Sequence, residues 1–456
     1  MTKLQAAPVL KTPPAPAPAS SALRTPAQKL VGFLTIGVSL AVLFAPPWLI
    51  PTDVYRLGLF SKYMALAVMA LSVDLVWGYT GLLSLGQGVY FGLGAYSVAY
   101  SLTLQKAAAD ASRPIGTVAP QFMSYTNFAP NDPNYVVPPA LAWIAPLGNI
   151  WVALAVAVLA PMLLAGLFGL VTCRLRIKGV YFALITQALL LAVFILVRNQ
   201  QRITGGVVGI KDVAKLELFG HTFHYAKKYI FELYYLMAGV LTVCFLLCAW
   251  LMRTKFGKVL TAIRDNENRA LALGYNTALY KTFIFALAGG LAGLAGASYV
   301  AANALCGPDY LTIAFSIEAV VWVAVGGRGS LLGAIVGTFL VNYAQSYVSS
   351  AFPDYWSILL GFLFIGAVVF LPRGLMAVAG PGALLGTLVG IIYVNTVVEF
   401  LGKHLSSKPL PRAWSVVLGC AFIALMVFAP RLAGLALKLL ALPLRYIARP
   451  RLGTAA

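Results

Sequence analysis

The sequence carries little charge and, in particular, few acidic residues. Only 13 of its 456 residues are Asp or Glu, against 33 Lys or Arg, and charged residues make up 10% of the chain. Hydrophobic residues make up 61% and the mean hydropathy is +0.87, well above the values of water-soluble globular domains. The composition therefore excludes a soluble domain, and the chain needs a lipid environment.

The motifs of catalysis and of metal binding are also missing. The sequence has no GxxxxGKS or GxxxxGKT phosphate-binding loop and no paired nucleophile and base, so it cannot hydrolyse ATP in the manner of such a loop. Its 5 cysteines lie mostly in or beside apolar segments without metal-ligand or disulfide spacing, which indicates core packing. The 3 histidines are isolated, and His221 with His224 is better explained as an exposed pair in a loop than as a metal site. We therefore predict that the chain is not an enzyme and binds no metal and no cofactor directly.

The net charge of +20 would suggest a nucleic-acid partner in a soluble protein. Here the Lys and Arg residues lie mostly in connections between apolar segments and at the two ends of the chain, as the retention of positive charge in the cytoplasm predicts. This distribution argues against nucleic-acid binding. The basic C-terminal tail is expected to be either an interfacial helix on the lipid of the inner leaflet or an ordinary cytoplasmic tail.

Long apolar runs dominate the sequence. They reach about 17 to 25 residues, the length at which a helix crosses a hydrocarbon core of roughly 30 Å. The runs contain too many Gly, Ala and Leu for the alternating strands of a barrel. The fold class is therefore all-α, a polytopic integral membrane protein with about 9 to 12 transmembrane or half-membrane helices. The expected segments are residues 30–50, 55–77, 83–104, 150–171, 180–197, 229–251, 282–302, 313–325, 330–347 and 356–371, with two more ending at residue 400 and covering 413–428.

Three regions differ in composition. Residues 1–29 are rich in Pro, Ala and Ser and are expected to form a disordered cytoplasmic leader. Residues 30–374 form the main membrane domain. Residues 375–456 are expected to form a C-terminal extension with about two further membrane helices and a basic amphipathic tail.

Positive charge in the short connections orients the chain. If the N-terminus lies in the cytoplasm, the basic residues at 174–178, at 253–269 and at 373 all lie on the cytoplasmic side. The connections 105–149 and 199–228 then lie outside. We therefore predict a cytoplasmic N-terminus.

Residues 255–281 are more than a connection between two membrane helices. Val259, Leu260 and Ile263 make one apolar helical face, Asp265 or Asn266 can cap a second short helix, and a glycine follows where that helix must stop. Two short helices with charged ends and a small apolar face suit docking into a groove of another protein. We predict a docking element on the cytoplasmic side.

Glycines interrupt two apolar stretches, residues 74–96 and residues 313–347. Glycine allows helices to approach closely, and it permits broken helices whose backbone groups line a solute path. The segment 313–325 is also too short to cross the bilayer alone. The predicted helix breaks are at Gly78, Gly81, Gly86, Gly88, Gly326, Gly327 and Gly329.

A few polar residues lie within the apolar segments. Asp74 and Glu318 are the acids among them, and burying either one as a charge costs several kcal/mol unless a partner or water is present. We expect this group to line the solute path, while a hydrogen bond between helices remains the alternative for each member. The group is Asp74, Ser84, Gln87, Thr186, Gln187, Glu318, Asn342 and Gln345.

Three stretches resemble the permeases of ABC importers, specifically the branched-chain amino acid and urea group. The run AIRDNENRALALG at 262–274 is similar to their cytoplasmic coupling helices, and GYTGLLSLGQG at 78–88 is similar to their signature, although Gln87 stands where His is common. The run from 316 to 356, which contains VGGRGS, resembles the urea permeases in particular. The resemblance covers roughly residues 55–374.

The resemblance implies a permease subunit of an ATP-driven importer for urea in the bacterial inner membrane, with residues 30–374 as its transmembrane domain and 255–281 as its coupling region. It implies as partners a second homologous permease, two ABC ATPase subunits that use the ATP, and an extracytoplasmic solute-binding protein. The alternatives are a branched-chain amino acid or short-amide permease and, less favoured, a stand-alone secondary transporter or channel. The residues implied for coupling to the ATPase are Arg264, Asp265, Glu267, Arg269 and Gly274.

Overall fold

The computed structural model describes residues 54–351, apart from 113–114, 116–138, 178, 212, 214, 219–220 and 224–228, together with the single residue 361. The predicted leader, the first predicted membrane segment, the segment 356–371 apart from residue 361, and the C-terminal extension lie outside the described residues. Five described helices are long and apolar enough to cross a membrane, and a bent pair raises this to six if the pair is one span. The all-α polytopic membrane class is therefore confirmed.

The five long helices follow the apolar runs because a backbone in lipid must satisfy its own hydrogen bonds. They begin and end within a few residues of the expected segments. The helices are α3 (Val54–Thr80), α6 (Ile150–Arg174), α7 (Val180–Asn199), α9 (Ile230–Arg253) and α12 (Thr277–Asn303).

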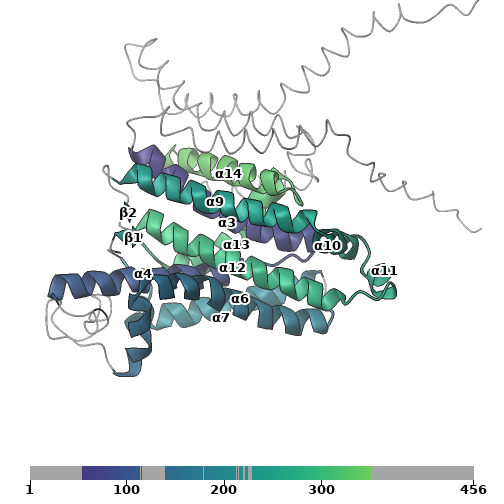
Figure 1. The fold of residues 1–456 in the computed structure, drawn as a ribbon, viewed down its shortest axis with the longest axis horizontal. Coiled ribbons are helices and arrows are strands. Elements are labelled where there is room, and N and C mark those ends of the chain that lie inside the picture. Colours follow the sequence, from purple (N-terminus) through teal and green to yellow (C-terminus); the bar gives the residue numbers. More distant parts are fainter. Residues whose placement is uncertain are drawn as a thin grey trace, which may run out of the picture.

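Burial separates the central helices from the peripheral ones. In the most apolar stretch of each helix, 89% of the residues of α3 and 72% of those of α12 are buried. The corresponding shares are 22% for α6 and α7 and 33% for α9. In Figure 1 the helices run side by side along the long axis, with α3 and α12 among them. The peripheral helices expose large apolar side chains such as Leu163 and Leu167, as a surface in contact with lipid requires.

The helix α4 (Gln87–Ala111) begins inside the bundle. The chain leaves the helical conformation after Thr80 and returns to it at Gln87, four residues beyond the expected start of this segment. Gly81 has φ +76°, a conformation that side chains rarely adopt. Farther along α4, a Cβ on Gly94 would meet the backbone of Gly293 on α12, so these two helices are in backbone contact.

The helices α13 (Ile313–Gly326) and α14 (Leu331–Ala351) form the predicted broken pair, with a bend of 117° between them. Gly327 has φ +125° and Gly329 has φ +79°, so this break depends on glycine at two positions. Three predicted breaks, at Gly81, Gly327 and Gly329, thus coincide with left-handed backbone.

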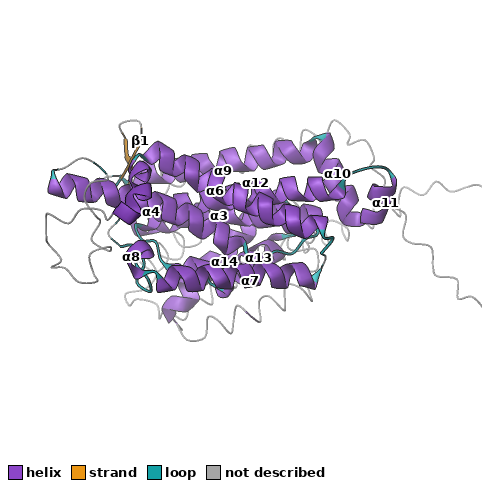
Figure 2. Ribbon diagram, turned by 90° about the horizontal axis from the view of Figure 1, so that it is seen from below, coloured by secondary structure: helices purple, strands orange, loops and turns teal. Residues whose placement is uncertain are grey.

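The remaining elements lie toward the ends of the bundle. The strands β1 (Leu216–Leu218) and β2 (His221–Phe223) form an antiparallel hairpin in which Leu216 pairs with Phe223. The hairpin adds a small β element that the apolar pattern did not predict, because three-residue strands leave no periodic signal. It lies at the opposite end from α10 (Lys255–Asp265) and α11 (Glu267–Ala272), as Figures 1 and 2 show. The other short elements are η1 (Pro139–Gly148), α8 (Gln201–Thr204) and η2 (Pro308–Leu311).

The cysteines in the described part of the chain are buried. Cys173, Cys244, Cys248 and Cys306 are all buried and unpaired with one another, which agrees with the predicted role in core packing. Within the same residues no group of three His, Cys, Asp or Glu side chains is placed to hold a metal ion.

Candidate functional site

The connection between α9 and α12 folds into two short helices, which confirms the predicted two-helix element. Leu260 and Ile263 of α10 are buried against the bundle. Asn266 is the N-cap of α11, and its side-chain oxygen accepts a hydrogen bond from the N–H of Arg269 at 3.0 Å. This bond satisfies one of the free donors at the start of α11.

Gly274 ends α11 with a left-handed turn. Its φ is +87°, its N–H donates to the carbonyl of Leu271 at 2.9 Å, and the N–H of Tyr275 donates to the carbonyl of Ala270 at 3.2 Å. This pair of bonds is the Schellman arrangement, which favours glycine. No atom lies within 4 Å of a Cβ placed on Gly274, so backbone conformation rather than space requires glycine here.

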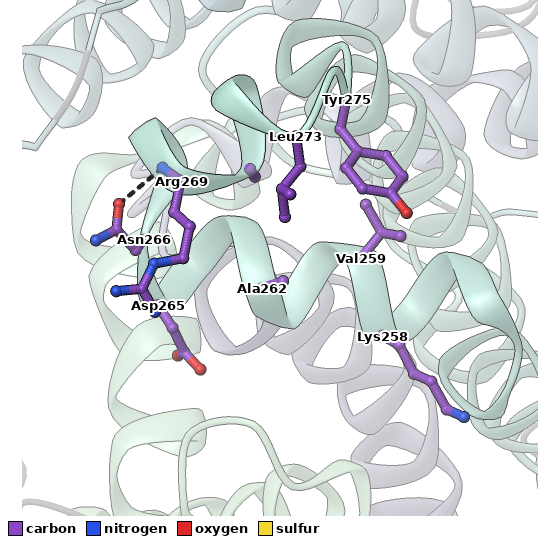
Figure 3. Close-up of a pocket in the computed structure, with 9 residues that line it drawn as sticks. Lys258, Val259, Ala262, Asp265, Asn266, Arg269, Leu273 and Tyr275 are labelled. Carbon is purple, nitrogen blue, oxygen red and sulfur yellow. Dashed lines mark hydrogen bonds between the residues drawn. The ribbon is translucent and has the colours of Figure 1, made fainter. Parts of the chain in front are cut away.

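A groove of about 460 Å³ lies between the two short helices. In Figure 3, Val259 and Ala262 of α10 face Leu273 and Tyr275 across it, and Lys258, Asp265 and Arg269 stand around them. Leu273 is 72% exposed and Tyr275 is 42% exposed, which is unusual for large apolar side chains of a well-packed element. The groove is therefore an apolar surface with a charged rim. The lining residues are Lys258, Val259, Ala262, Asp265, Asn266, Arg269, Ala270, Leu273 and Tyr275.

The predicted coupling residues divide into two sets. Asp265, Arg269 and Gly274 are exposed on the two-helix element. Glu267 instead faces the bundle, where its Oε1 lies 2.7 Å from Nζ of Lys281 and accepts a bond from the Thr277 hydroxyl at 3.2 Å. Arg264 is also exposed as a residue, but its side chain is 31% exposed and reaches inward, where its Nη1 donates to the carbonyl of Gly78 at 2.8 Å.

The end of α3 meets the break between α13 and α14. Asp74 is fully buried, and its Oδ1 accepts a hydrogen bond from the N–H of Gly329 at 2.7 Å. The guanidinium carbon of Arg328 lies 5.3 Å from the centre of the Trp77 ring, within the range of a cation–π contact. Asp74, which was predicted to line the solute path, is thus placed at the helix break.

Three of the predicted polar residues come together where the chain re-enters the bundle between α3 and α4. The Thr186 hydroxyl accepts a bond from the N–H of Leu85 at 3.1 Å, and the Ser84 hydroxyl accepts one from the N–H of Gly86 at 3.4 Å. Gln87 is buried, and its Oε1 accepts a bond from Ser72 at 3.4 Å. Its Nε2 has no hydrogen-bond partner among the described residues.

Two serines that the sequence did not single out join this cluster. Ser72 bonds Gln87, and the Ser316 hydroxyl accepts a bond from the N–H of Gly88 at 3.2 Å. Each is a single small residue in an apolar helix, so no pattern marks it in the sequence. We name the set Ser72, Ser84, Gln87, Thr186 and Ser316 the re-entry cluster.

The other predicted path residues lie elsewhere in the fold. Asn342 is buried on α14, where its Nδ2 donates to the carbonyl of Thr338 at 2.8 Å. Gln187, Glu318 and Gln345 are half-buried on α7, α13 and α14. Gly78 and Gly88, predicted as breaks, lie inside the last turn of α3 and the first turn of α4. At Gly78 a Cβ would lie 2.6 Å from the nitrogen of Gly329, so glycine at this position allows α3 to approach the break closely.

A model of the family described as branched-chain amino acid transport system / permease component matches residues 55–368. The chain belongs to this family. The match contains the two-helix element, the helix break and the re-entry cluster. The protein is therefore a permease of this transport family.

Several curated relatives are similar to this permease. The high-affinity branched-chain amino acid transport system permease protein LivM of Escherichia coli (strain K12) is 25% identical over 337 residues, which are 70% of this chain and 69% of the relative. The LivM protein of Salmonella typhimurium (strain LT2) is equally similar. The autoinducer 2 import system permease protein LsrC of Salmonella paratyphi B is 27% identical over 235 residues, which are 49% of this chain and 64% of the relative. No solved structure matches the chain.

Proposed function

We propose that this permease is the membrane subunit of an ATP-driven ABC importer in the bacterial inner membrane, and that its solute is urea. The observation that carries the first part is the α10–α11 groove, an exposed apolar surface with a charged rim at one end of a membrane bundle. A chain without a phosphate-binding loop needs another subunit to use ATP, and a rigid two-helix element is a means of receiving force from it. ATP then binds the partner subunits, and no cofactor binds this chain.

The remaining partners follow from the same assembly. Two ATPase subunits serve two permeases, so a second homologous permease stands beside this one, and apolar faces such as that of α7 are available for it and for lipid. An extracytoplasmic binding protein delivers the solute at the hairpin end. The N-terminus and the α10–α11 element lie in the cytoplasm, residues 1–29 form the leader, 30–374 the permease domain, and 375–456 the extension.

The re-entry cluster supports urea as the solute. Its members are neutral donors and acceptors next to the start of α4, and Gln87 has a buried Nε2 with no partner among the described residues. A small, planar, neutral amide can bond such groups without needing a counter-ion. An amino acid carries an ammonium and a carboxylate, and both charges demand partners when they leave water.

A branched-chain amino acid is the second candidate. The LivM relatives, which match over 70% of this chain, favour it. The half-buried Glu318 on α13 supplies an acid that an ammonium group would use. A stand-alone secondary transporter or channel is less favoured, because it has no use for the exposed groove.

The test is uptake by the complete complex in proteoliposomes, with labelled urea and labelled leucine offered in separate vesicles and ATP supplied to the ATPase side. We expect ATP-dependent accumulation of urea and no accumulation of leucine. Accumulation of leucine without accumulation of urea would show that the solute is leucine rather than urea. Accumulation by the purified permease alone, without an ATPase subunit, would reject the ABC assignment.

A further inference from the structure

We infer that Arg264 and Asp74 are positioning residues for transport, which join the α10–α11 element to the helix break between α13 and α14. A displacement of α10 by the ATPase would then move the break through the end of α3. The inference rests on the proposed ATP-driven function. It assigns Arg264 to force transmission inside the permease, in place of direct contact with the ATPase, and it removes Asp74 from the solute path.

The first half of the connection is the bond from Arg264 to α3. The bond spans 186 positions in sequence and ends on the carbonyl of Gly78, in the last turn of α3. Carbonyls in a last helical turn lack helical partners, and a cation there also meets the negative end of the helix dipole. Arg264 therefore caps a central membrane helix from the docking element.

The guanidinium of Arg264 also lies beside the break itself. Its Nη1 is 3.4 Å from the position of a Cβ on Gly329, and its Cγ is 3.3 Å from that of a Cβ on Gly81. One side chain thus touches the end of α3, the start of the re-entering chain and the break. Only 31% of this side chain is exposed, against 69% for its neighbour Asp265.

The second half of the connection is Asp74, one turn before Gly78 on the same helix. Its Oδ1 holds the N–H of Gly329, and its Oδ2 has no hydrogen-bond partner among the described residues. Arg328 and Arg264 are the cations whose charges act on this carboxyl group. Asp74 therefore joins α3 to the break through the hydrogen bond of one oxygen.

The backbones of α3 and of the break also approach closely, beside the Asp74 side chain. A Cβ on Gly78 would lie 2.2 Å from Oδ1 of Asp74, 2.6 Å from the nitrogen of Gly329 and 2.8 Å from its Cα. Beyond the break, a Cβ on Gly337 of α14 would lie 2.7 Å from the nitrogen of Gly326. Packed backbones transmit a displacement without absorbing it. A shift of the α3 end would therefore reach both α13 and α14.

The decisive experiment compares Arg264→Gln with Arg174→Gln in the complete complex. Arg174 is the matched control, because it is an exposed arginine at the end of α6 and does not line the groove. For Arg264→Gln we expect normal assembly, ATP hydrolysis that continues, and uptake reduced about tenfold or more, the loss expected for one charged hydrogen bond. Arg264→Lys should restore part of the uptake, and Arg174→Gln should resemble the wild type. Loss of ATPase binding in Arg264→Gln would show docking instead and overturn the inference.

A second measurement does not need transport. Hydrogen exchange on the purified full-length permease compares the exchange rates of the backbone N–H groups in residues 326–331 with those in residues 85–88. We expect Arg264→Gln to accelerate exchange at 326–331 several-fold and Arg174→Gln to leave it unchanged. Unchanged exchange in Arg264→Gln would overturn the inference, even if the wild-type complex imports urea. If the wild-type complex imports nothing while the exchange result holds, the proposed function fails and the structural connection stands.

Discussion

Glu267 and Lys281 form an ion pair with 2.7 Å between Oε1 and Nζ, and their side chains are 15% and 8% exposed. The pair ties α11 to the start of α12, so the α10–α11 element is bonded to two central helices, to α3 through Arg264 and to α12 through Glu267. The surface of this element that remains exposed is the groove and its rim.

Removal of one member of this pair should destabilise the protein. Glu267→Gln leaves the Lys281 ammonium largely buried without its counter-charge, which costs about 3 kcal/mol. We expect a lower Tm for the purified permease, and partial recovery in the double variant Glu267→Gln with Lys281→Met. Thermal unfolding in detergent measures this, with Asp265→Asn as the exposed control. Equal Tm values for Glu267→Gln and Asp265→Asn would contradict the expectation.

A side chain at Gly274 should disturb the docking surface through the backbone. Its φ of +87° costs a non-glycine residue about 1 to 2 kcal/mol, and Asn bears this conformation better than Val. We expect Gly274→Val to lower recovery of the ATPase subunits with the permease and to reduce uptake, and Gly274→Asn to retain both more fully. Co-purification measures the first effect. Normal recovery with Gly274→Val would argue that the turn has no part in docking.

A methyl group at Gly78 should separate α3 from the break. The added Cβ would lie 2.2 Å from Oδ1 of Asp74 and 2.6 Å from the nitrogen of Gly329, so the Asp74 side chain and the break must move away from it at a cost of about 1 to 3 kcal/mol. We expect Gly78→Ala to lower both the Tm and uptake. The matched control is Gly239→Ala on α9, where the methyl group meets no atom within 4 Å. If the two variants behave alike, the contact at Gly78 is looser than the structure indicates.

Loss of the amide at Gln87 should affect the solute rather than assembly. Gln87→Leu removes the buried Nε2 that has no partner among the described residues, and we expect urea uptake to fall about tenfold with normal ATPase binding. Gln105→Leu, on the same helix α4, is the control, since Gln105 bonds the carbonyl of Gly148 far from the re-entry cluster. Uptake measured over a range of urea concentrations checks the prediction, and equal uptake by both variants would remove Gln87 from the path.

The sequence predicted the long helices and the two-helix element well, for a simple physical reason. Apolar runs in lipid must be helical, and the residues that start and stop the short helices are local. Asn266 and Gly274 therefore stand where expected. The start of α4 was placed too early because residues 81–86 are as apolar as a helix. The start of α12 was placed five residues too late, because its capped first turn is polar.

By itself, then, the amino-acid order determined that this chain is a helical membrane bundle with glycine breaks and a two-helix element, since hydropathy and capping act over a few neighbouring residues. Only the tertiary structure decided that Arg264 and Glu267 turn inward while Arg269 and Leu273 remain exposed. It alone brought Asp74 to Gly329, 255 positions away, and Ser316 to Gly88. Such contacts depend on which helices lie side by side, and that arrangement results from packing across the whole bundle rather than from any local pattern.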